Sequence, residues 1–162
     1  MSALTPEAVL ERVPQQRPMR FISEILELDD EHILTSYTWT QEDCAGHFPG
    51  YPVVPGIKLI ECAAQAGCVA WGIYHLSAAM PLDALSHHVG FFTGVEEASF
   101  LRPVRPGDKV RTAATFGEEG YFRANKIVSQ AVISLADGTQ VFRGRLSGVW
   151  MPRSDFEHAS LR

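Results

Sequence analysis

The hydrophobic pattern divides the chain into one long apolar segment and several alternating segments. The longest apolar run covers residues 56–77, is rich in alanine and leucine-type residues, and predicts a buried helix. A membrane span is not predicted there, because polar side chains interrupt the run at Lys58, Glu61, Gln65 and His75. A helix that is apolar nearly all round has to be covered by other elements on every side.

Extended segments lie on both sides of this helix. Residues 19–28 and 32–39 flank a polar Asp-Asp-Glu turn and predict a hairpin. Four more runs with strand character follow the helix, separated by turn sequences that include Pro-Gly-Asp at 106–108, Glu-Glu-Gly at 118–120 and Asp-Gly at 137–138. These runs cover residues 89–101, 109–116, 121–135 and 139–150.

Two strands, one apolar helix and four further strands predict an α+β domain, with a curved antiparallel sheet wrapped around the central helix. A short helix is also predicted at residues 5–13, with Thr5 as its cap and Pro6 as its first residue. No repeat or linker divides the sequence, so residues 1–162 are predicted to be a single domain. The exposed strand edges favour pairing with a second copy of the chain.

Composition and charge exclude some classes of function. The formal net charge of -5 and the absence of any run of lysine and arginine argue against nucleic-acid binding. The first residues lack the basic and apolar regions of a signal peptide, so we expect a cytoplasmic protein with no membrane association. Cys44, Cys62 and Cys68 contain no Cys-x-x-Cys pair and are predicted to be buried, reduced thiols.

His47 and Glu61 are the candidate catalytic residues. His47 lies in a loop whose path is fixed by glycines and prolines, and Glu61 lies on the second turn of the predicted helix. A histidine and a carboxylate held across an apolar pocket are suited to taking a proton from carbon and giving one to a leaving oxygen. Gly56 would offer a free backbone N–H at the positive end of the helix dipole, where an enolate oxygen could be stabilised. Together these residues suggest elimination of water next to a carbonyl, or the reverse addition.

The same residues also allow a structural interpretation. A single histidine in a loop is often structural. Lys58, Glu61 and Gln65 recur at helical spacing and could form the solvated stripe of an amphipathic helix. The Cys44-x-x-His47 spacing allows a thiol nucleophile or half of a metal site, although no second ligand pair occurs at zinc spacing. Spacing alone does not decide between these interpretations.

Two separated motifs carry a family resemblance. GHFPGYPVVPGIKLIECAAQ, at residues 46–65, fits the pattern G-H-F-P-G-x-P-x-x-P-G followed at a fixed distance by an acidic residue. FFTGVEEASFLRPVRPGDKV, at residues 91–110, fits a later strand and turn. Both motifs closely resemble those of the 3-hydroxyacyl-[acyl-carrier-protein] dehydratases, hot-dog-fold enzymes of the FabZ and FabA type. The resemblance spans roughly residues 15–150.

The resemblance implies a hot-dog fold and a hydro-lyase that dehydrates 3-hydroxyacyl thioesters without a metal or organic cofactor. His47 would remove the α-proton, and Glu61 would protonate the departing hydroxyl. The Gly56 N–H would hold the thioester oxygen, with Gln65 and Pro55 in supporting positions. In this family the site lies at a dimer interface, so His47 and Glu61 would come from different chains.

The resemblance also implies partners. The acyl group would be linked through phosphopantetheine to an acyl carrier protein, and the assembly would be a homodimer, a trimer of dimers or a heteromeric dehydratase. Phe91 and Phe92 could line an acyl tunnel, or could simply pack in the core. The basic residues that could form a rim for an acidic carrier protein are Arg102, Arg105 and Lys109.

Two departures from the family pattern favour a specialised relative, for example one in polyene or other secondary acyl metabolism. Lys58 stands where relatives carry an apolar residue; it would lower the pKa of Glu61 if it reached that carboxyl, or else points to solvent or to the carrier protein. Ser23 and Glu24 stand near the place of the family's Asp-Arg pair. The alternatives to a dehydratase are a non-catalytic or partner-dependent acyl-binding subunit, and an acyl thioesterase on the same fold.

Overall fold

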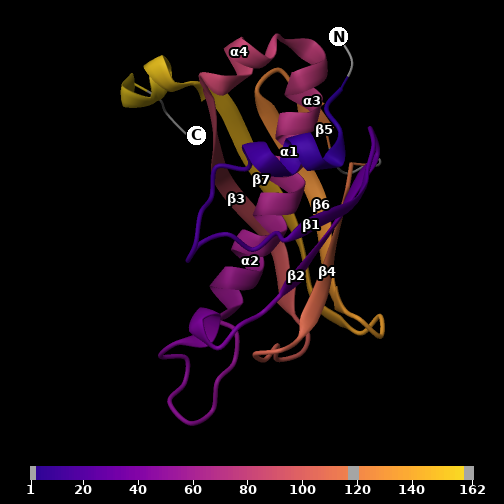
Figure 1. The fold of residues 1–162 in the computed structure, drawn as a ribbon, viewed down its shortest axis with the longest axis vertical. Helices are drawn as coiled ribbons and strands as arrows, with labels where there is room; N and C mark the ends of the chain where they lie inside the picture. Colours follow the sequence, from indigo (N-terminus) through magenta and orange to yellow (C-terminus); the bar gives the residue numbers. More distant parts are fainter. Residues whose placement is uncertain (1–2, 117–120, 159–162) are drawn as a thin grey trace.

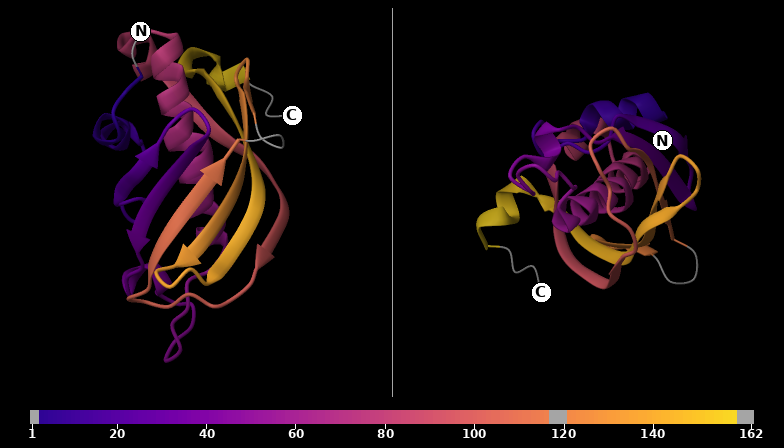
Figure 2. Two further views of the ribbon diagram at one scale, coloured as in Figure 1. Left: turned by 90° about the vertical axis from the view of Figure 1, so that its right-hand side faces the viewer. Right: turned by 90° about the horizontal axis from the view of Figure 1, so that it is seen from below.

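The computed structural model describes residues 3–116 and 121–158. It shows a seven-stranded antiparallel sheet that curves around one long helix (Figures 1 and 2), as the sequence predicted. The strand order is β1-β2-β4-β6-β7-β3, and β5 pairs with β6 beside this path. The strands are β1 (Glu24–Leu28), β2 (His32–Thr38), β3 (His88–Phe100), β4 (Lys109–Thr115), β5 (Tyr121–Arg123), β6 (Lys126–Leu135) and β7 (Gln140–Pro152).

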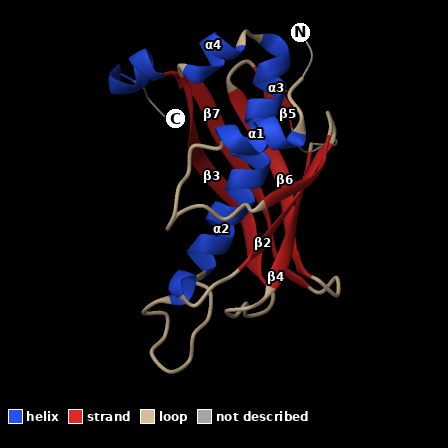
Figure 3. Cartoon of the chain, viewed as in Figure 1, coloured by secondary structure: helices blue, strands red, loops and turns tan. Residues whose placement is uncertain are grey.

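The central helix is continuous (Figure 3), and its winding changes midway. It begins with α2 (Gly56–Ala64), continues through a π-helical segment (Gln65–Ala70) and ends with α3 (Trp71–Ala79), two residues beyond the predicted end. Insertions of this kind in α-helices often occur at functional sites. Within the described residues, no helix has both the length and the apolar character to cross a membrane.

Small residues allow the helix to lie close against the concave face of the sheet. Ala63, Ala66 and Ala70 are fully buried. At Gly67 an added Cβ would collide with the Ser129 hydroxyl and would lie 3.1 Å from the Ala114 Cβ. The sheet therefore packs directly on the helix backbone at this point, which leaves no room for a larger side chain.

The N-terminal part of the chain covers the side of the helix that faces away from the sheet (Figures 1 and 2). The predicted first helix is observed as α1 (Pro6–Arg12), and the Thr5 hydroxyl accepts a hydrogen bond from the Ala8 N–H at 3.4 Å. Val9 on this helix is fully buried. The following segment, residues 13–22, runs along the central helix and is bonded to it, as described below.

Three details differ from the sequence prediction. The run at residues 121–135 is two strands, because Ala124 adopts a left-handed conformation and the chain reverses between Arg123 and Lys126. Between the central helix and β3, a segment for which the sequence predicted no element, lies a short helix, α4 (Leu82–Ser86). The hairpin's first strand begins only at Glu24, since Met19 and Phe21 bond to Gln65 of the central helix instead. The turn predicted at residues 118–120 lies outside the described residues.

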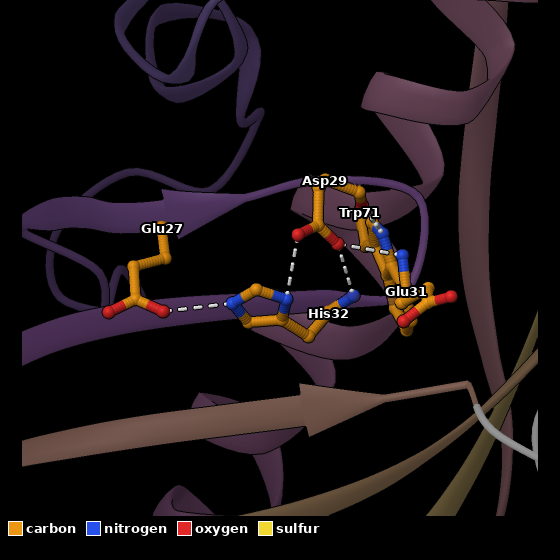
Figure 4. Close-up of polar contacts among 5 residues, drawn as sticks. All are labelled: Glu27, Asp29, Glu31, His32 and Trp71. Atoms are coloured by element: carbon orange, nitrogen blue, oxygen red, sulfur yellow. Dashed lines mark hydrogen bonds and ion pairs between the residues drawn. The ribbon is translucent and has the colours of Figure 1, made fainter.

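A charged cluster, which we call the hairpin cluster, closes the β1–β2 turn (Figure 4). It consists of Glu27, Asp29 and His32. The two ring nitrogens of His32 lie 2.9 Å from Glu27 Oε2 and 3.0 Å from Asp29 Oδ2. Because each carboxylate only accepts, both nitrogens donate when both bonds are made, and the ring is then an imidazolium. The hydrogen bond to Glu27 is the main cause that raises the pKa of His32 above its ordinary value.

Candidate active site

The loop at residues 45–55 holds His47 in a defined orientation. Gly46 and Gly50 occupy the left-handed region, and the loop closes on itself through Val53 N–H, which donates to the His47 carbonyl at 2.9 Å. The His47 Nδ1 lies 3.1 Å from the Val53 carbonyl oxygen. Since a carbonyl can only accept, Nδ1 carries a hydrogen, and in the neutral ring Nε2 is then the nitrogen that can accept a proton. The imidazole is therefore prepared to act as a general base.

The turn that precedes this loop is fastened to the central helix through Asp43. The buried Asp43 carboxylate accepts hydrogen bonds from the Tyr37 hydroxyl and from both the N–H and the hydroxyl of Thr40, at 2.8–2.9 Å. Burial and the bond to Asp43 raise the pKa of Tyr37. The Lys58 ammonium donates to the Asp43 carbonyl at 2.7 Å. Lys58 thus binds the turn before the loop, so two of the three expectations for it are wrong: it does not contact Glu61, and its ammonium does not simply point into solvent.

Glu61 is held by Gln65, one turn further along the helix. Gln65 is fully buried, and its Oε1 accepts from the Phe21 N–H at 2.8 Å. Its Nε2 donates to the Met19 carbonyl at 2.6 Å and to Glu61 Oε1 at 2.8 Å. The amide orientation is therefore fixed by three partners. Glu61 Oε1 is occupied as an acceptor, which leaves Oε2 as the oxygen that can carry a transferable proton.

Glu61 lines a cavity of about 160 Å³ between the helix and the β3–β7 part of the sheet. Phe91 and Phe92 on β3 form part of its wall, so they line a pocket and do not belong to the core. Gln15, which the sequence did not single out, also reaches this cavity, and its Oε1 is buried without a hydrogen-bond partner among residues 3–116 and 121–158. An unpaired buried acceptor is costly unless a ligand or water satisfies it. The cavity therefore combines an apolar wall with two polar groups suited to a hydroxyl.

Gly56 begins helix α2 directly after Pro55, as the sequence predicted. The Gly56 N–H belongs to the first turn, where backbone donors have no partner within the helix. The Phe100 ring from β3 lies over Gly56, so an added Cβ would come within 2.9 Å of the ring. Glycine thus allows the close approach of this aromatic side chain.

The two candidate catalytic residues do not meet within one chain. In the described part of the chain, no hydrogen bond joins His47 to Glu61, and His47 is not among the residues that line the Glu61 cavity. The loop with His47 projects beyond the N-terminal end of α2 (Figures 1 and 2). A reaction that needs both groups therefore requires a second chain or a large movement of the loop.

An apolar surface suited to such a second chain lies next to both halves of the site. β3 is at one edge of the sheet, with one side of its backbone unpaired. Large apolar side chains are exposed on β3, on the His47 loop and at the start of α2; they are Phe92, Val95, Phe100, Phe48, Tyr51 and Ile57. Exposed apolar groups beside an open strand edge are typical of an interface.

The alternative chemistries considered for the cysteines and the basic residues are not favoured by the geometry. All three cysteines are free and buried, as predicted, and burial raises the pKa of the Cys44 thiol. Across residues 3–116 and 121–158, no three His, Cys, Asp or Glu side chains gather closely enough to hold a metal ion. Of the predicted basic rim, Lys109 is paired with Glu24 at 3.5 Å, whereas the Arg105 guanidinium lies by the Tyr51 ring of the His47 loop.

Comparison with known proteins gives the following matches in sequence. A family model described as ApeI-like, ApeI dehydratase, matches residues 30–135, more than half of the chain. A 3-hydroxyacyl-[acyl-carrier-protein] dehydratase FabZ from Desulfotalea psychrophila is 38% identical over 105 residues, which cover 63% of this chain and 66% of the relative. A protein of the same name from Oenococcus oeni is 34% identical over 115 residues, which cover 69% and 77%.

Solved structures match the fold over nearly the whole chain. The dehydratase heterocomplex ApeI:P from Xenorhabdus doucetiae has a chain that is similar with a TM-score of 0.75 at 19% identity, covering 96% of this chain and 97% of that one. A thioesterase from Haemophilus influenzae is similar with a TM-score of 0.65 at 19% identity, covering 93% of both chains. At these identities the structures show the shared fold, while the family follows from the sequence matches.

Proposed function

This chain belongs to the ApeI-like family of dehydratases, and from that premise we propose that it converts 3-hydroxyacyl thioesters into trans-2-enoyl thioesters by eliminating water. One observation carries the proposal to particular residues. His47 has its Nδ1 committed to a carbonyl, and Glu61 has one oxygen committed to Gln65, so each presents a single free atom for proton transfer. This is the arrangement that a paired general base and general acid need.

The proposed reaction assigns one step to each group. His47 Nε2 removes a proton from C2 of the acyl chain, and the thioester oxygen, where negative charge develops, accepts a hydrogen bond from the Gly56 N–H. The electrons of the broken C–H bond form the C2–C3 double bond while the C3–O bond breaks. Glu61 Oε2 gives its proton to the leaving hydroxyl, which departs as water. The reverse sequence of steps hydrates the enoyl thioester.

The active assembly in this proposal is a dimer, formed with a second copy of the chain. The exposed apolar side chains beside the open β3 edge support this assembly, as does the separation of His47 from Glu61 within one chain. His47 of one chain would then complete the Glu61 cavity of the other. A heteromeric partner is the alternative, because the solved ApeI:P structure is a heterocomplex. Trimers of dimers would need a further interface.

The proposed substrate is carried by an acyl carrier protein through phosphopantetheine, and the reaction is assigned to fatty-acid or specialised lipid biosynthesis in the cytoplasm. The carrier is taken from the sequence relatives, which are named for acyl-carrier-protein substrates. Arg105, beside the His47 loop, is the best-placed basic residue to meet an acidic carrier. No step of the proposed mechanism needs a metal or organic cofactor.

Mixing two inactive variants tests the proposed mechanism and the two-chain site together. We expect His47→Ala and Glu61→Gln each to lose activity on 3-hydroxyacyl thioesters by several orders of magnitude while remaining folded dimers. After unfolding and refolding the two variants together, half of the dimers are hybrids, and each hybrid holds one intact site and one doubly altered site. About one quarter of the wild-type activity should therefore return.

Other outcomes would redirect the proposal. A mixture that stays inactive, although hybrid dimers form, would show that both residues act within one chain. A wild-type dimer that turns over no hydroxyacyl or enoyl thioester would favour the partner-dependent subunit. Release of free thiol from acyl thioesters would favour the thioesterase, which is the function named for the similar Haemophilus influenzae structure.

A further inference from the structure

A second cavity lies next to the Glu61 cavity. It has a volume of about 230 Å³, and its walls include the apolar side chains of Ile73, Leu82 and Leu85. Two residues line both cavities, Gly90 on β3 and Trp150 on β7. We call the Glu61 cavity the near cavity and this second cavity the far cavity. The near cavity contains the carboxylate of the candidate site, and the far cavity continues beyond Trp150.

The Trp150 side chain is held in place as a partition between the two cavities. An added Cβ at Gly72 of the helix would collide with the indole nitrogen, and one at Gly90 would come within 2.9 Å of the ring. The ring therefore fills the space between these two glycines. Its Nε1–H donates to the Cys68 carbonyl at 3.0 Å, within the π-helical segment. Only 5% of Trp150 is exposed, so the ring has little freedom to move aside.

The size of the near cavity limits what it can hold. A cavity of this volume accommodates a ligand of about six heavy atoms, the size of benzene. An acyl chain that starts beside Glu61 would thus reach the indole after about six carbons. The far cavity offers more volume and an apolar wall, with Arg12 and Arg153 among its lining residues. A longer alkyl or polyenoyl chain could enter it only if the Trp150 ring were absent or displaced.

We propose that Trp150 sets the acyl-chain length that this protein accepts, and that the far cavity is a latent extension of the acyl site. This inference rests on the proposed dehydratase function, because it takes the near cavity as the place of the acyl chain. The natural substrate class is then short to medium 3-hydroxyacyl thioesters. Chains that extend well past the near cavity are excluded by the indole, and the walls of the far cavity suit a hydrocarbon.

The test compares wild type with Trp150→Ala on 3-hydroxyhexanoyl and 3-hydroxydodecanoyl thioesters. We expect wild type to prefer the hexanoyl substrate. In the variant, kcat/KM for the dodecanoyl substrate divided by kcat/KM for the hexanoyl substrate should rise at least tenfold. The reason is that each methylene newly buried favours binding by about fourfold. A second change, Leu85→Trp, fills the far cavity and should return the ratio of the Trp150→Ala protein to near the wild-type value.

Trp71→Ala is the matched control. Trp71, on the central helix, is also buried, its indole N–H also donates to a backbone carbonyl, that of Asp29 at 2.9 Å, and it lines neither cavity. We expect it to lower stability without changing the chain-length ratio. If either alanine variant fails to fold, Trp150→Phe and Trp71→Phe replace the pair, since both lose the same N–H donor; only Trp150→Phe should then shift the ratio.

A binding measurement separates this inference from the proposed function. The stabilisation of each folded protein by hexanoyl- and dodecanoyl-pantetheine, measured as a change in Tm, needs no catalysis. If wild type has no dehydratase activity but Trp150→Ala gains stabilisation by the dodecanoyl ligand, the length limit stands while the proposed function fails. If wild type is an active dehydratase and a folded Trp150 variant keeps the wild-type ratio and the wild-type ligand response, the partition has no such role.

Discussion

Replacing Gln65 by leucine tests whether one buried amide both fastens the N-terminal segment and positions the general acid. Leucine has a similar size but makes none of the three hydrogen bonds that join Gln65 to Phe21, Met19 and Glu61. The Phe21 N–H would be left without an acceptor beside a fully buried side chain. The lost bonds to Met19 and Glu61 contribute about 1 kcal/mol each and the unsatisfied Phe21 N–H costs about 1–3 kcal/mol, so the free energy of unfolding should fall by ~3–5 kcal/mol.

Two assays check this prediction. Urea unfolding monitored by tryptophan fluorescence gives the free energy of unfolding, and the kinetics on a 3-hydroxyacyl thioester give kcat and KM. We expect kcat to fall more than KM rises, since the variant leaves Glu61 in place but frees its carboxylate to rotate. A loss of stability below about 1 kcal/mol, or an unchanged kcat, would refute the reasoning from these hydrogen bonds.

Gln65→Glu is the matched comparison, because one oxygen can still accept from the Phe21 N–H. The other oxygen then faces Glu61 Oε1 in place of an N–H donor. Two adjacent carboxyls cannot both ionise easily, so the apparent pKa of the pair rises above that of the unfolded chain. The folded state then binds more protons than the unfolded state in that pH range, and the variant should become more stable as pH falls through it. Leucine at this position should show no such pH dependence.

Three further variants test other contacts. Lys58→Met removes the hydrogen bond to the Asp43 carbonyl and should reduce stability by ~1 kcal/mol, while the pH–rate profile keeps its shape because Lys58 does not contact Glu61. Gly67→Ala should destabilise the protein by about 1–3 kcal/mol in urea unfolding, since its Cβ would collide with Ser129; an unchanged midpoint would contradict the close packing. His32→Gln should cost at most ~1 kcal/mol below pH ~6.5, and this difference should disappear as pH rises through the raised pKa of His32; equal losses at low and high pH would contradict the imidazolium.

The fold followed from the sequence because local patterns and a specific motif agreed. The apolar run at 56–77 marked all but the last two residues of the central helix, the alternating runs marked the strands to within two residues apart from the start of β1, and Thr5 with Pro6 marked the first helix. The two-strand division of residues 121–135 was missed because the turn falls at Ala124, a residue type that seldom adopts a left-handed conformation. The family resemblance was confirmed by the match to residues 30–135.

The candidate site was predictable in its residue types but not in its contacts. Helical spacing suggested that Lys58, Glu61 and Gln65 could be a solvated stripe, yet Gln65 is fully buried and Lys58 binds the turn before the loop. Their partners come from residues far away in the sequence, which no local pattern specifies. Gln15 and Trp150 were missed for the same reason, since each acquires its role only where the helix and the sheet bring separate segments together.

The contacts of His47 and Glu61 have a consequence for how assembly would control activity. Within a single chain, the Val53 carbonyl already orients His47 and the Gln65 amide already orients Glu61. The proposed dimer therefore has to bring two prepared groups together and does not have to reorganise either one. Activity should then fall in proportion to the fraction of dissociated chains on dilution, with no change in the pH–rate profile of the remaining dimers. A profile that shifts on dilution would mean that the interface also sets the protonation of one of the two residues.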